Sequence, residues 1–209
     1  MEMIAKEAKV AVGTLYLHFS SRDAVYLNLA VESGERLIER FREAKARGLD
    51  TLEELRALMR EYIAHFRDAR YSFLLSSANI AQIRKRLRRA SDIRKFERMT
   101  ELRREIFGTV QTTMREACEA GLIADPFGPT IGTALLWSSV KGALELAGDG
   151  QFWRELTGLD PEVFVEKIPE ALIISSGTRA SAPRSGGSPI RSNPQDHSQD
   201  EIGTDARTV

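Results

Sequence analysis

Apolar residues recur at every third or fourth position along most of this chain, which is the spacing of one face of an α-helix. No run alternates apolar and polar residues for long enough to predict a β-strand. The pattern therefore predicts an all-α protein. Besides a pair of short helices within 4–19, helices are predicted over residues 22–47, 51–66, 71–83, 91–120, 130–147 and 161–176.

Residues that favour helix ends mark the starts of the longer helices. Five starts are predicted in this way: at Ser20 or Ser21, at Thr51 with Glu54 as a capping box, at Ser91 or Asp92, at Asp125 followed by Pro126, and at Asp160 followed by Pro161. Pro169 lies inside the last apolar stripe, where it removes one helical hydrogen bond, and it is expected to kink or split that helix.

The composition changes near residue 177. From there to residue 209 the chain is rich in Ser, Gly, Pro, Asp and Arg and has too few large aliphatic residues to offset the entropy of ordering its backbone. We therefore expect a disordered tail over 177–209, and a helical part before it that divides into residues 1–46 and 47–176.

The stretch IAKEAKVAVGTLYLHF, residues 4–19, has the pattern of two short helices separated by a tight turn. Ile4, Ala5, Ala8, Leu15 and Phe19 are predicted to face inward, with Val10 in the turn. The residues left facing outward are small or form hydrogen bonds, as expected for a helix that lies in a major groove. They are Val12, Gly13, Thr14, Tyr16, Leu17 and His18.

This stretch resembles the TetR family of one-component bacterial transcriptional regulators, whose usual run is I-A-x-x-A-G-V-S-x-G-T-L-Y-x-H/Y-F followed by Lys or Arg. The matching residues are Ile4, Ala5, Ala8, Val10, Gly13, Thr14, Leu15, Tyr16, His18 and Phe19, with Arg22 in the basic position. Two residues depart from the run. Lys9 replaces the turn glycine, in a conformation that favours positive φ, and Ala11 replaces the Ser or Thr that caps the recognition helix.

The resemblance implies a ligand-responsive repressor that binds a palindromic DNA operator as a homodimer. Residues 1–46 would then be a DNA-binding head with its connecting helix, and residues 47–176 a helical ligand-binding and dimerisation body. Base and phosphate contacts are expected from the outward residues 12–14 and 16–18, and backbone contacts from Lys9 and Arg22. The family has a further helix ahead of this motif, so we expect the natural head to extend before Met1. The alternative is a ligand-binding and dimerisation module that no longer binds DNA.

The formal net charge is zero, but its distribution is uneven. Residues 1–115 carry 23 Lys and Arg against 16 Asp and Glu, and the remainder carries 7 against 14. A basic front half and an acidic back half suit a protein that meets DNA with one end. The basic run 83–90 could be a second nucleic-acid contact, although a solvated helix end or loop is the interpretation we favour.

The predicted helix 130–147 is apolar on two faces, and only one of them can be used within its own subunit. In the TetR family the last two helices form a four-helix bundle with their copies in a second subunit. The residues expected at this dimer interface are Ile131, Leu135, Ser138, Gly142, Leu146, Phe164, Ile168 and Leu172.

Large apolar side chains on several helices must surround a common centre in the body. The residues expected around a small apolar or amphipathic effector there are Tyr62, Phe66, Phe73, Met99, Phe107 and Trp137. Filling the core without any cavity is the alternative for the same residues. His65 could line such a pocket, but a partly exposed helix position is the interpretation that we favour.

The sequence holds no motif typical of an enzyme. It has no Gly-rich phosphate loop, no H-E-x-x-H, no G-x-S-x-G and no pair of histidines at ligand spacing, so we expect no catalysis, no cofactor and no metal. Cys118 is the single cysteine and is interpreted as an apolar helix residue. No stretch is apolar enough to cross a bilayer, so we expect no membrane partner and a cytoplasmic protein.

Overall fold

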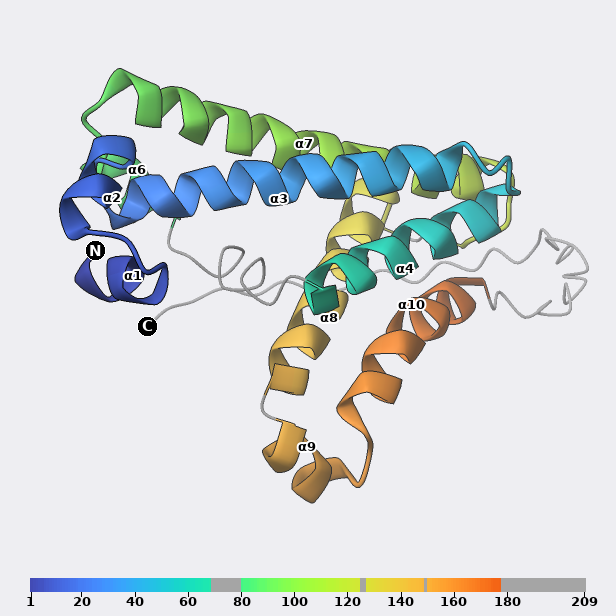
Figure 1. Ribbon diagram of the computed structural model, residues 1–209. Helices are drawn as coiled ribbons and strands as arrows, with labels where there is room; N and C mark the ends of the chain where they lie inside the picture. The colour runs from blue at the N-terminus through green and yellow to red at the C-terminus, as the bar shows by residue number, and fades with distance from the viewer. Residues whose placement is uncertain (69–79, 125–126, 149, 178–209) are drawn as a thin grey trace, which may run out of the picture. The chain divides into compact units, whose positions relative to one another are not determined.

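The computed structural model describes residues 1–68, 80–124, 127–148 and 150–177, and in these ranges all regular structure is helical (Figure 1). The all-α prediction is confirmed. In chain order the helices are α1 Glu2–Glu7, α2 Val12–His18, α3 Arg22–Lys45, α4 Thr51–Asp68, α6 Ile80–Arg86, α7 Ala90–Glu119, α8 Pro129–Gly148, α9 Gly150–Thr157 and α10 Pro161–Gly177. Most of the helix expected over 71–83, and the tail beyond Gly177, lie outside the described residues.

The two longest helices, α3 and α7, pack along each other (Figure 1). Both bury one stripe, with Leu27 and Phe41 on α3 facing the side of α7 that holds Met99 and Leu102. A Cβ at Gly34 would lie 3.2 Å from Leu102 Cβ, so glycine permits the close approach of the two helices at this point.

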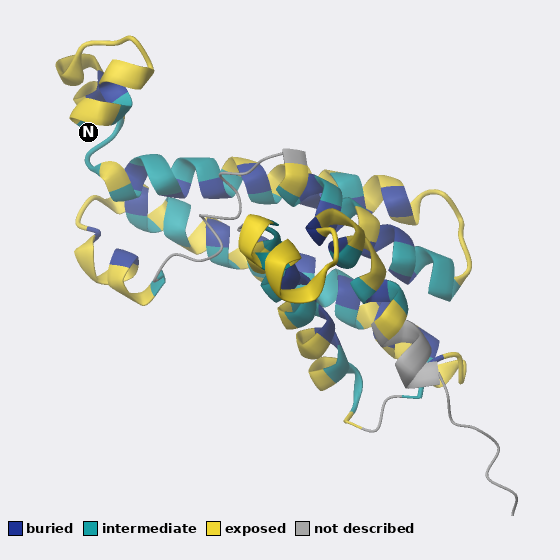
Figure 2. Ribbon diagram, turned by 90° about the horizontal axis from the view of Figure 1, so that it is seen from below, coloured by how far each residue is buried: buried dark blue, intermediate teal, exposed yellow. Residues whose placement is uncertain are grey.

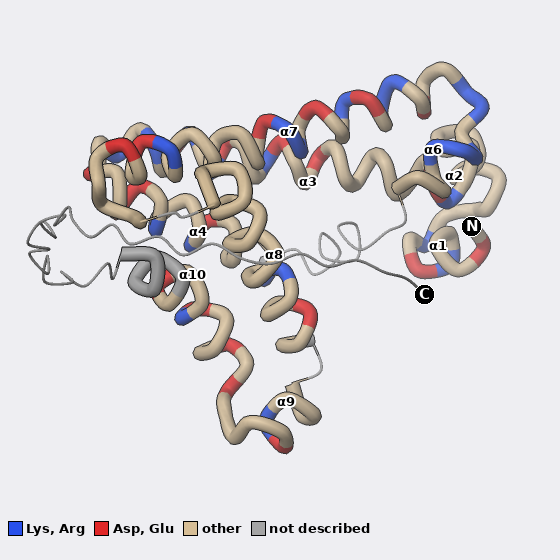
Figure 3. Tube along the Cα trace, turned by 180° about the vertical axis from the view of Figure 1, so that it is seen from behind, with Lys and Arg blue, Asp and Glu red and all other residues tan. Residues whose placement is uncertain are grey.

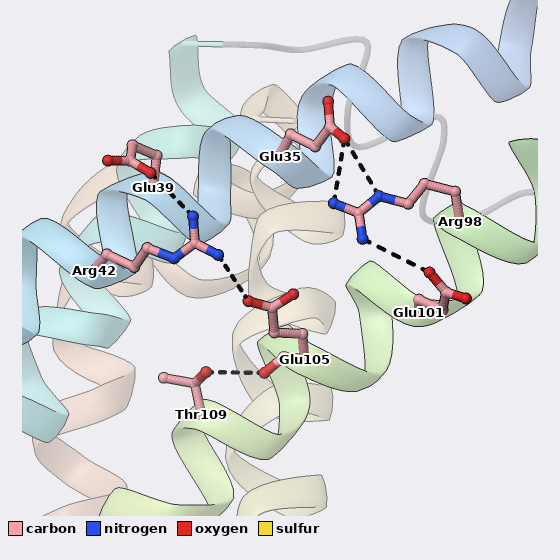
Figure 4. A network of polar contacts seen from close by, with 7 residues as sticks. All are labelled: Glu35, Glu39, Arg42, Arg98, Glu101, Glu105 and Thr109. Atoms are coloured by element: carbon pink, nitrogen blue, oxygen red, sulfur yellow. Dashed lines mark hydrogen bonds and ion pairs between the residues drawn. The ribbon is translucent and has the colours of Figure 1, made fainter.

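The outer edge of the α3–α7 contact carries a polar network (Figure 4). Arg42 binds Glu105 at 3.2 Å and Arg98 binds Glu35 at 3.3 Å, so each helix contributes one guanidinium and one carboxylate. All four side chains are at least 43 % exposed. Exposed ion pairs of this kind add little stability, and we regard the network as fixing the register of the two helices.

Helices α4, α8 and α10 complete the main core against the C-terminal halves of α3 and α7. Tyr62, Val140 and Val165 from these three helices are at most 2 % exposed. Figure 2 shows buried and exposed residues alternating along the long helices, as the apolar stripes predicted. A second, smaller cluster joins Leu27 and Ala30 of α3 to residues of α6 and α7.

The predicted helix starts are only partly confirmed. Ser21 caps α3 by accepting the amide of Ala24 at 3.2 Å, and Asp160 caps α10 by accepting the amide of Glu162 at 2.9 Å. The predicted capping box at Thr51 is wrong, because the cap of α4 is Asp50. Asp125 and Pro126 lie outside the residues that the structure describes.

The prediction for α7 is also wrong. This helix begins one residue earlier than expected, at Ala90, and has no side-chain cap. The side chain of Asp92 instead accepts a hydrogen bond from Ser20, so a tertiary contact takes the place of the local one.

Helix α10 continues through Pro169 over Pro161–Gly177, so the predicted split does not occur. One missing hydrogen bond is tolerated there because Pro169 itself is buried in the packing. Residues 1–179 form one compact unit. The expected boundary between head and body at 46/47 stays a prediction.

Candidate nucleic-acid interface and internal cavity

The head consists of α1, a turn and α2. The turn is closed by backbone hydrogen bonds from Lys9 to Lys6 and from Val10 to Ala5, at 3.2 and 3.0 Å. Lys9 has φ 55°, the only described non-glycine residue with positive φ, as its place in the motif predicts. Ala11 stands at the start of α2 without a side-chain cap.

All eight residues predicted to contact DNA are exposed. Leu17 is 82 % exposed, Tyr16 49 % and Val12 37 %, while Leu15 on the opposite face is 8 % exposed. The rest of this set is exposed as well: Lys9, Gly13, Thr14, His18 and Arg22. The arrangement leaves one face of α2 open to a partner.

Two residues on the inner side of the motif, one at the end of α1 and one in the turn, are exposed. Ala8 is exposed and Val10 is 41 % exposed, whereas Ala5 and Leu15 are buried and Ile4 and Phe19 are half-buried. Helices of six and seven residues cover only the positions near their crossing. A residue at the helix end or in the turn therefore stays in water even when it has the right sequence spacing.

The start of α3 connects the head to α6 and α7. Ser20 donates a 2.5 Å hydrogen bond to Asp92 at the start of α7, and Asp23 accepts two hydrogen bonds from Arg86 of α6. Lys95 lies 5.9 Å from the centre of the Phe19 ring. These contacts hold the residues after α2 and the start of α3 against the last turn of α6 and the first turns of α7.

The basic run 83–90 spans the end of α6 and the start of α7, near the beginning of α3 (Figure 3). Its Ile83 and Leu87 are buried in the smaller core cluster, and its Lys and Arg residues are exposed. This is the pattern of an amphipathic helix end with a solvated outer face.

An internal cavity of about 310 Å³ lies between α3, α4, α7 and α8. It contains five of the six residues predicted around the effector, namely Tyr62, Phe66, Met99, Phe107 and Trp137. Phe73 lies outside the described residues. The other lining residues are Ala30, Ser33, Gly34, Leu37, His65, Leu102, Arg103, Ile106 and Lys141.

Aromatic rings form one continuous wall of this cavity. The centroid of the Tyr62 ring lies 4.7 Å from that of Phe66 and 4.7 Å from that of Trp137. The centroids of Trp137 and Phe107 are 6.0 Å apart, and all three pairs are tilted. Burial raises the pKa of Tyr62, so its phenol stays neutral. Such a wall binds flat or flexible apolar groups.

Polar groups in the cavity are few, and sequence reasoning missed most of them. The interpretation of His65 as partly exposed is wrong, since it is 3 % exposed and lies 2.8 Å from Ser33 Oγ on α3. Arg103 and Lys141 bring two cations from α7 and α8. In the sequence, a charged residue within an apolar stripe could have indicated these positions. Lys141 is such a residue in α8, whereas Arg103 cannot be told from its neighbour Arg104 by sequence alone.

The outward face of α8 is apolar and is exposed among the described residues. Ile131 and Leu135 are each 50 % exposed and Leu146 is 45 % exposed. Ser138, Gly142, Phe164 and Ile168 of the predicted dimer interface line a groove between α8 and α10. The side chain of Leu172 lies outside the described residues.

Comparison with known proteins identifies the head and the fold. Residues 1–29 match the family described as "Bacterial regulatory proteins, tetR family". Among solved structures, the fatty acid degradation regulator FadR from Bacillus halodurans superposes with a TM-score of 0.59 at 16 % identity, covering 81 % of each chain. No curated protein sequence matches significantly. Among the described helices, none combines the length and the apolar character needed to cross a bilayer.

The family match covers the motif that carries the resemblance, and the shared fold extends over the body. The head is thus similar to that of the tetR family of bacterial regulatory proteins, and the fold is similar to that of a solved regulator structure.

Proposed function

We propose that this regulator is a ligand-responsive repressor that binds a palindromic operator as a homodimer and releases it when a small apolar or amphipathic effector enters the cavity. The observation that carries the proposal is the path of α3. This helix begins at Arg22, directly after α2, and its Ala30 and Leu37 line the cavity. One rigid element thus belongs to both sites.

A ligand in the cavity would act on α3 through these lining residues. Helix α3 is continuous from the cavity to its first turn and rises about 1.5 Å per residue. A shift or tilt of α3 near the cavity therefore also moves its first turn. That turn holds the contacts of Ser20 and Asp23 with α7 and α6. An effector that favours a different setting of α3 would therefore change the position of α2, and it acts only through its differential affinity for the two settings.

DNA contacts are proposed for the exposed face of α2, with Val12, Gly13, Thr14, Tyr16, Leu17 and His18 against the groove and Lys9 and Arg22 against the backbone. Exposed hydroxyls and basic groups that flank a short helix suit phosphate contacts, while the apolar and imidazole groups suit base edges. Three observations support this assignment: the exposure of the face, the positive φ of the Lys9 turn and the family match at residues 1–29.

The test is operator binding by the 209-residue protein, measured by gel shift and fluorescence anisotropy with the DNA upstream of its own gene. Tyr16→Ala and Arg22→Ala are expected to weaken binding to all sequences, and Arg22→Ala to lower the salt slope by about one. Arg115→Ala, an exposed Arg near the far end of α7, is the matched control and should change neither quantity.

Changes at Leu17 or His18 are expected to alter which operator is preferred rather than the overall affinity, because these side chains are assigned to base edges. If Tyr16→Ala and Arg22→Ala leave operator affinity unchanged, the contact assignment is wrong. If the wild-type protein binds no DNA but still binds an effector, the alternative holds and the chain is a ligand-binding and dimerisation module.

A further inference from the structure

We propose that residues 80–97, which we call the α6–α7 corner, form a second contact surface for DNA and bind the phosphate backbone beside the site of the head. This inference rests on the proposed function as a DNA-binding regulator. It assigns most of the electrostatic attraction for DNA to the α6–α7 corner, and the choice of sequence to α2.

The helix-turn-helix segment has no excess of positive charge. Residues 1–23 hold three Lys and Arg side chains against three Asp and Glu side chains. Double-stranded DNA carries one negative charge per about 1.7 Å of its axis, and a protein gains affinity by neutralising phosphates with Lys and Arg and releasing their counter-ions. Residues 1–23 therefore offer DNA a shape and hydrogen bonds, but little net attraction.

The positive charge is concentrated in the α6–α7 corner instead. Its residues 80–97 hold seven Lys and Arg side chains against two acidic ones, so their excess of five makes up most of the excess of seven in residues 1–115. Figure 3 shows basic residues gathered at α6 and at the start of α7. The seven cations are Arg84, Lys85, Arg86, Arg88, Arg89, Arg94 and Lys95.

Most of these cations are available to a partner. All except Lys95 are exposed. Arg86 forms an ion pair with Asp23, and within the described ranges none of the other six pairs with a carboxylate. Of the two acids in the corner, Asp92 is 6 % exposed and already accepts a hydrogen bond from Ser20. The outer surface of the corner therefore presents cations to solvent.

The corner is attached to the residues that directly follow α2. Arg86 donates two hydrogen bonds to the carboxylate of Asp23, at 2.7 and 3.1 Å. The ammonium group of Lys95 lies 5.9 Å from the centre of the ring of Phe19, the first residue after α2. A duplex bound to the exposed face of α2 would therefore meet the corner with the phosphates that flank the groove.

The apolar residues of the corner argue against a membrane surface as the partner. A helix that lies on a bilayer inserts an exposed apolar face among the lipids. Ile83 and Leu87 are 5 % and 6 % exposed and pack in the smaller core cluster with Leu27. Between residues 80 and 97 no large apolar side chain is exposed. The corner thus offers charge without an apolar face to insert, which suits phosphates in water.

The test is the salt dependence of DNA binding by the full 209-residue protein. Fluorescence anisotropy is measured between about 50 and 200 mM salt, on operator DNA and on an unrelated duplex of equal length. The double variant Lys85→Gln/Arg89→Gln should lower the salt slope by about two, so its loss of affinity should be about tenfold larger at the low end of this range. The loss should be equal on both duplexes, because phosphate contacts carry no sequence information.

The matched control is the double variant Arg104→Gln/Arg115→Gln. It removes two exposed cations from later turns of α7 and changes the net charge by the same amount. The control should keep the wild-type slope, so that an effect of net charge alone is distinguished from a contact at the corner. Circular dichroism melting of both double variants checks that the fold is retained, as expected for exposed side chains.

Equal slopes for the wild-type protein and Lys85→Gln/Arg89→Gln would overturn the inference, and so would equal losses in the two double variants. In either case a wild-type preference for the operator would leave the proposed function standing. A slope that falls only in the corner variant, without any operator preference in the wild-type protein, would support the corner and contradict the repressor.

Two further outcomes concern the partner itself. A wild-type protein that binds neither duplex at about 50 mM salt would overturn the corner and the repressor together. Vesicles of phosphatidylcholine with phosphatidylserine provide the competing anionic surface. Binding to these vesicles that is lost in Lys85→Gln/Arg89→Gln, with an unchanged DNA slope in that variant, would assign the corner to a membrane surface and overturn the inference.

Discussion

Lys9 has a strained backbone conformation in the turn of the head. Its φ of 55° lies in the left-handed region, which costs a residue with a Cβ roughly 1 to 2 kcal/mol relative to glycine. The position is nevertheless a cation next to a helix assigned to DNA. A lysine at this turn lowers the local stability of the head and places a positive charge at the edge of the proposed interface.

Replacing Lys9 with glycine is expected to strengthen the head and weaken its binding to DNA at the same time. Relief of strain of about 1 kcal/mol should slow hydrogen exchange of the α1 and α2 amides several-fold. Loss of the charge should lower the salt slope of operator binding by about one. Lys6→Gly is the control, since Lys6 has helical φ inside α1, and there glycine should speed exchange. Faster exchange in Lys9→Gly would contradict the strain argument.

Local signals predicted residues well where no tertiary contact competed. Ser21 and Asp160 cap their helices as expected, because each lies beside the amides that it binds. Glu54 does not form the predicted capping box but binds Thr113 and Lys45. Asp92 does not cap α7 but accepts a hydrogen bond from Ser20. Sequence spacing carries no information about such partners, which come from other helices.

The same limit applies to the cavity. Helical periodicity predicted which aromatic residues face inward, and Tyr62, Phe66 and Trp137 do share one cavity wall. It did not predict the burial of His65, because the partner Ser33 is thirty-two residues away on α3. Whether facing residues fill a core or leave a space depends on helix separation, and that quantity cannot be read from periodicity.

At the scale of elements, the start of α3 is the point where head and body meet. Asp92 is 6 % exposed and accepts a 2.5 Å hydrogen bond from the hydroxyl of Ser20, just before α3. The Arg42–Glu105 ion pair between α3 and α7 is exposed to solvent. The bond between Ser20 and Asp92 is partly buried, and such a hydrogen bond to a charged group contributes more than an exposed ion pair. We therefore assign the α3–α7 attachment near the head to Ser20 and Asp92.

A double-mutant cycle on Ser20→Ala and Asp92→Ala tests this assignment by urea denaturation. The coupling free energy is expected to be about 1 to 3 kcal/mol, because each single change leaves a partner unsatisfied. The matched cycle on Arg42→Ala and Glu105→Ala joins the same helices and should give less than about 1 kcal/mol. Equal couplings in the two cycles would show that the junction near the head is no stronger than the exposed network.

For the whole molecule, we propose that a second subunit covers the exposed face of α8. Three large aliphatic residues at helical spacing, Ile131, Leu135 and Leu146, are about half exposed, and the groove beside them runs to Phe164 on α10. An apolar face of this kind on the outside of a subunit is typical of an interface. A two-fold axis through α8 and α10 would cover the face on both subunits with the same residues.

Gly142 allows the dimer to be tested without disturbing the subunit. A Cβ at Gly142 meets no atom of its own chain within 4 Å among the described residues, so Gly142→Asp should leave the folding of the subunit unchanged. In a closely packed helix interface the same carboxylate would be buried without a partner, at a cost of several kcal/mol. Light scattering at micromolar concentration should therefore give the dimer mass for the wild-type protein and the monomer mass for Gly142→Asp and Leu135→Glu.

The control is Gly108→Asp, which places the same charge at a helical glycine of α7 that also has open space around its Cβ and lies outside the proposed interface. This variant should remain a dimer. Because all three carry a similar change of charge, a loss of mass confined to the two α8 variants can come only from the face that they share. A wild-type monomer would contradict the dimer and leave the palindromic operator without its structural basis. A Gly142→Asp dimer would place the second subunit on another face.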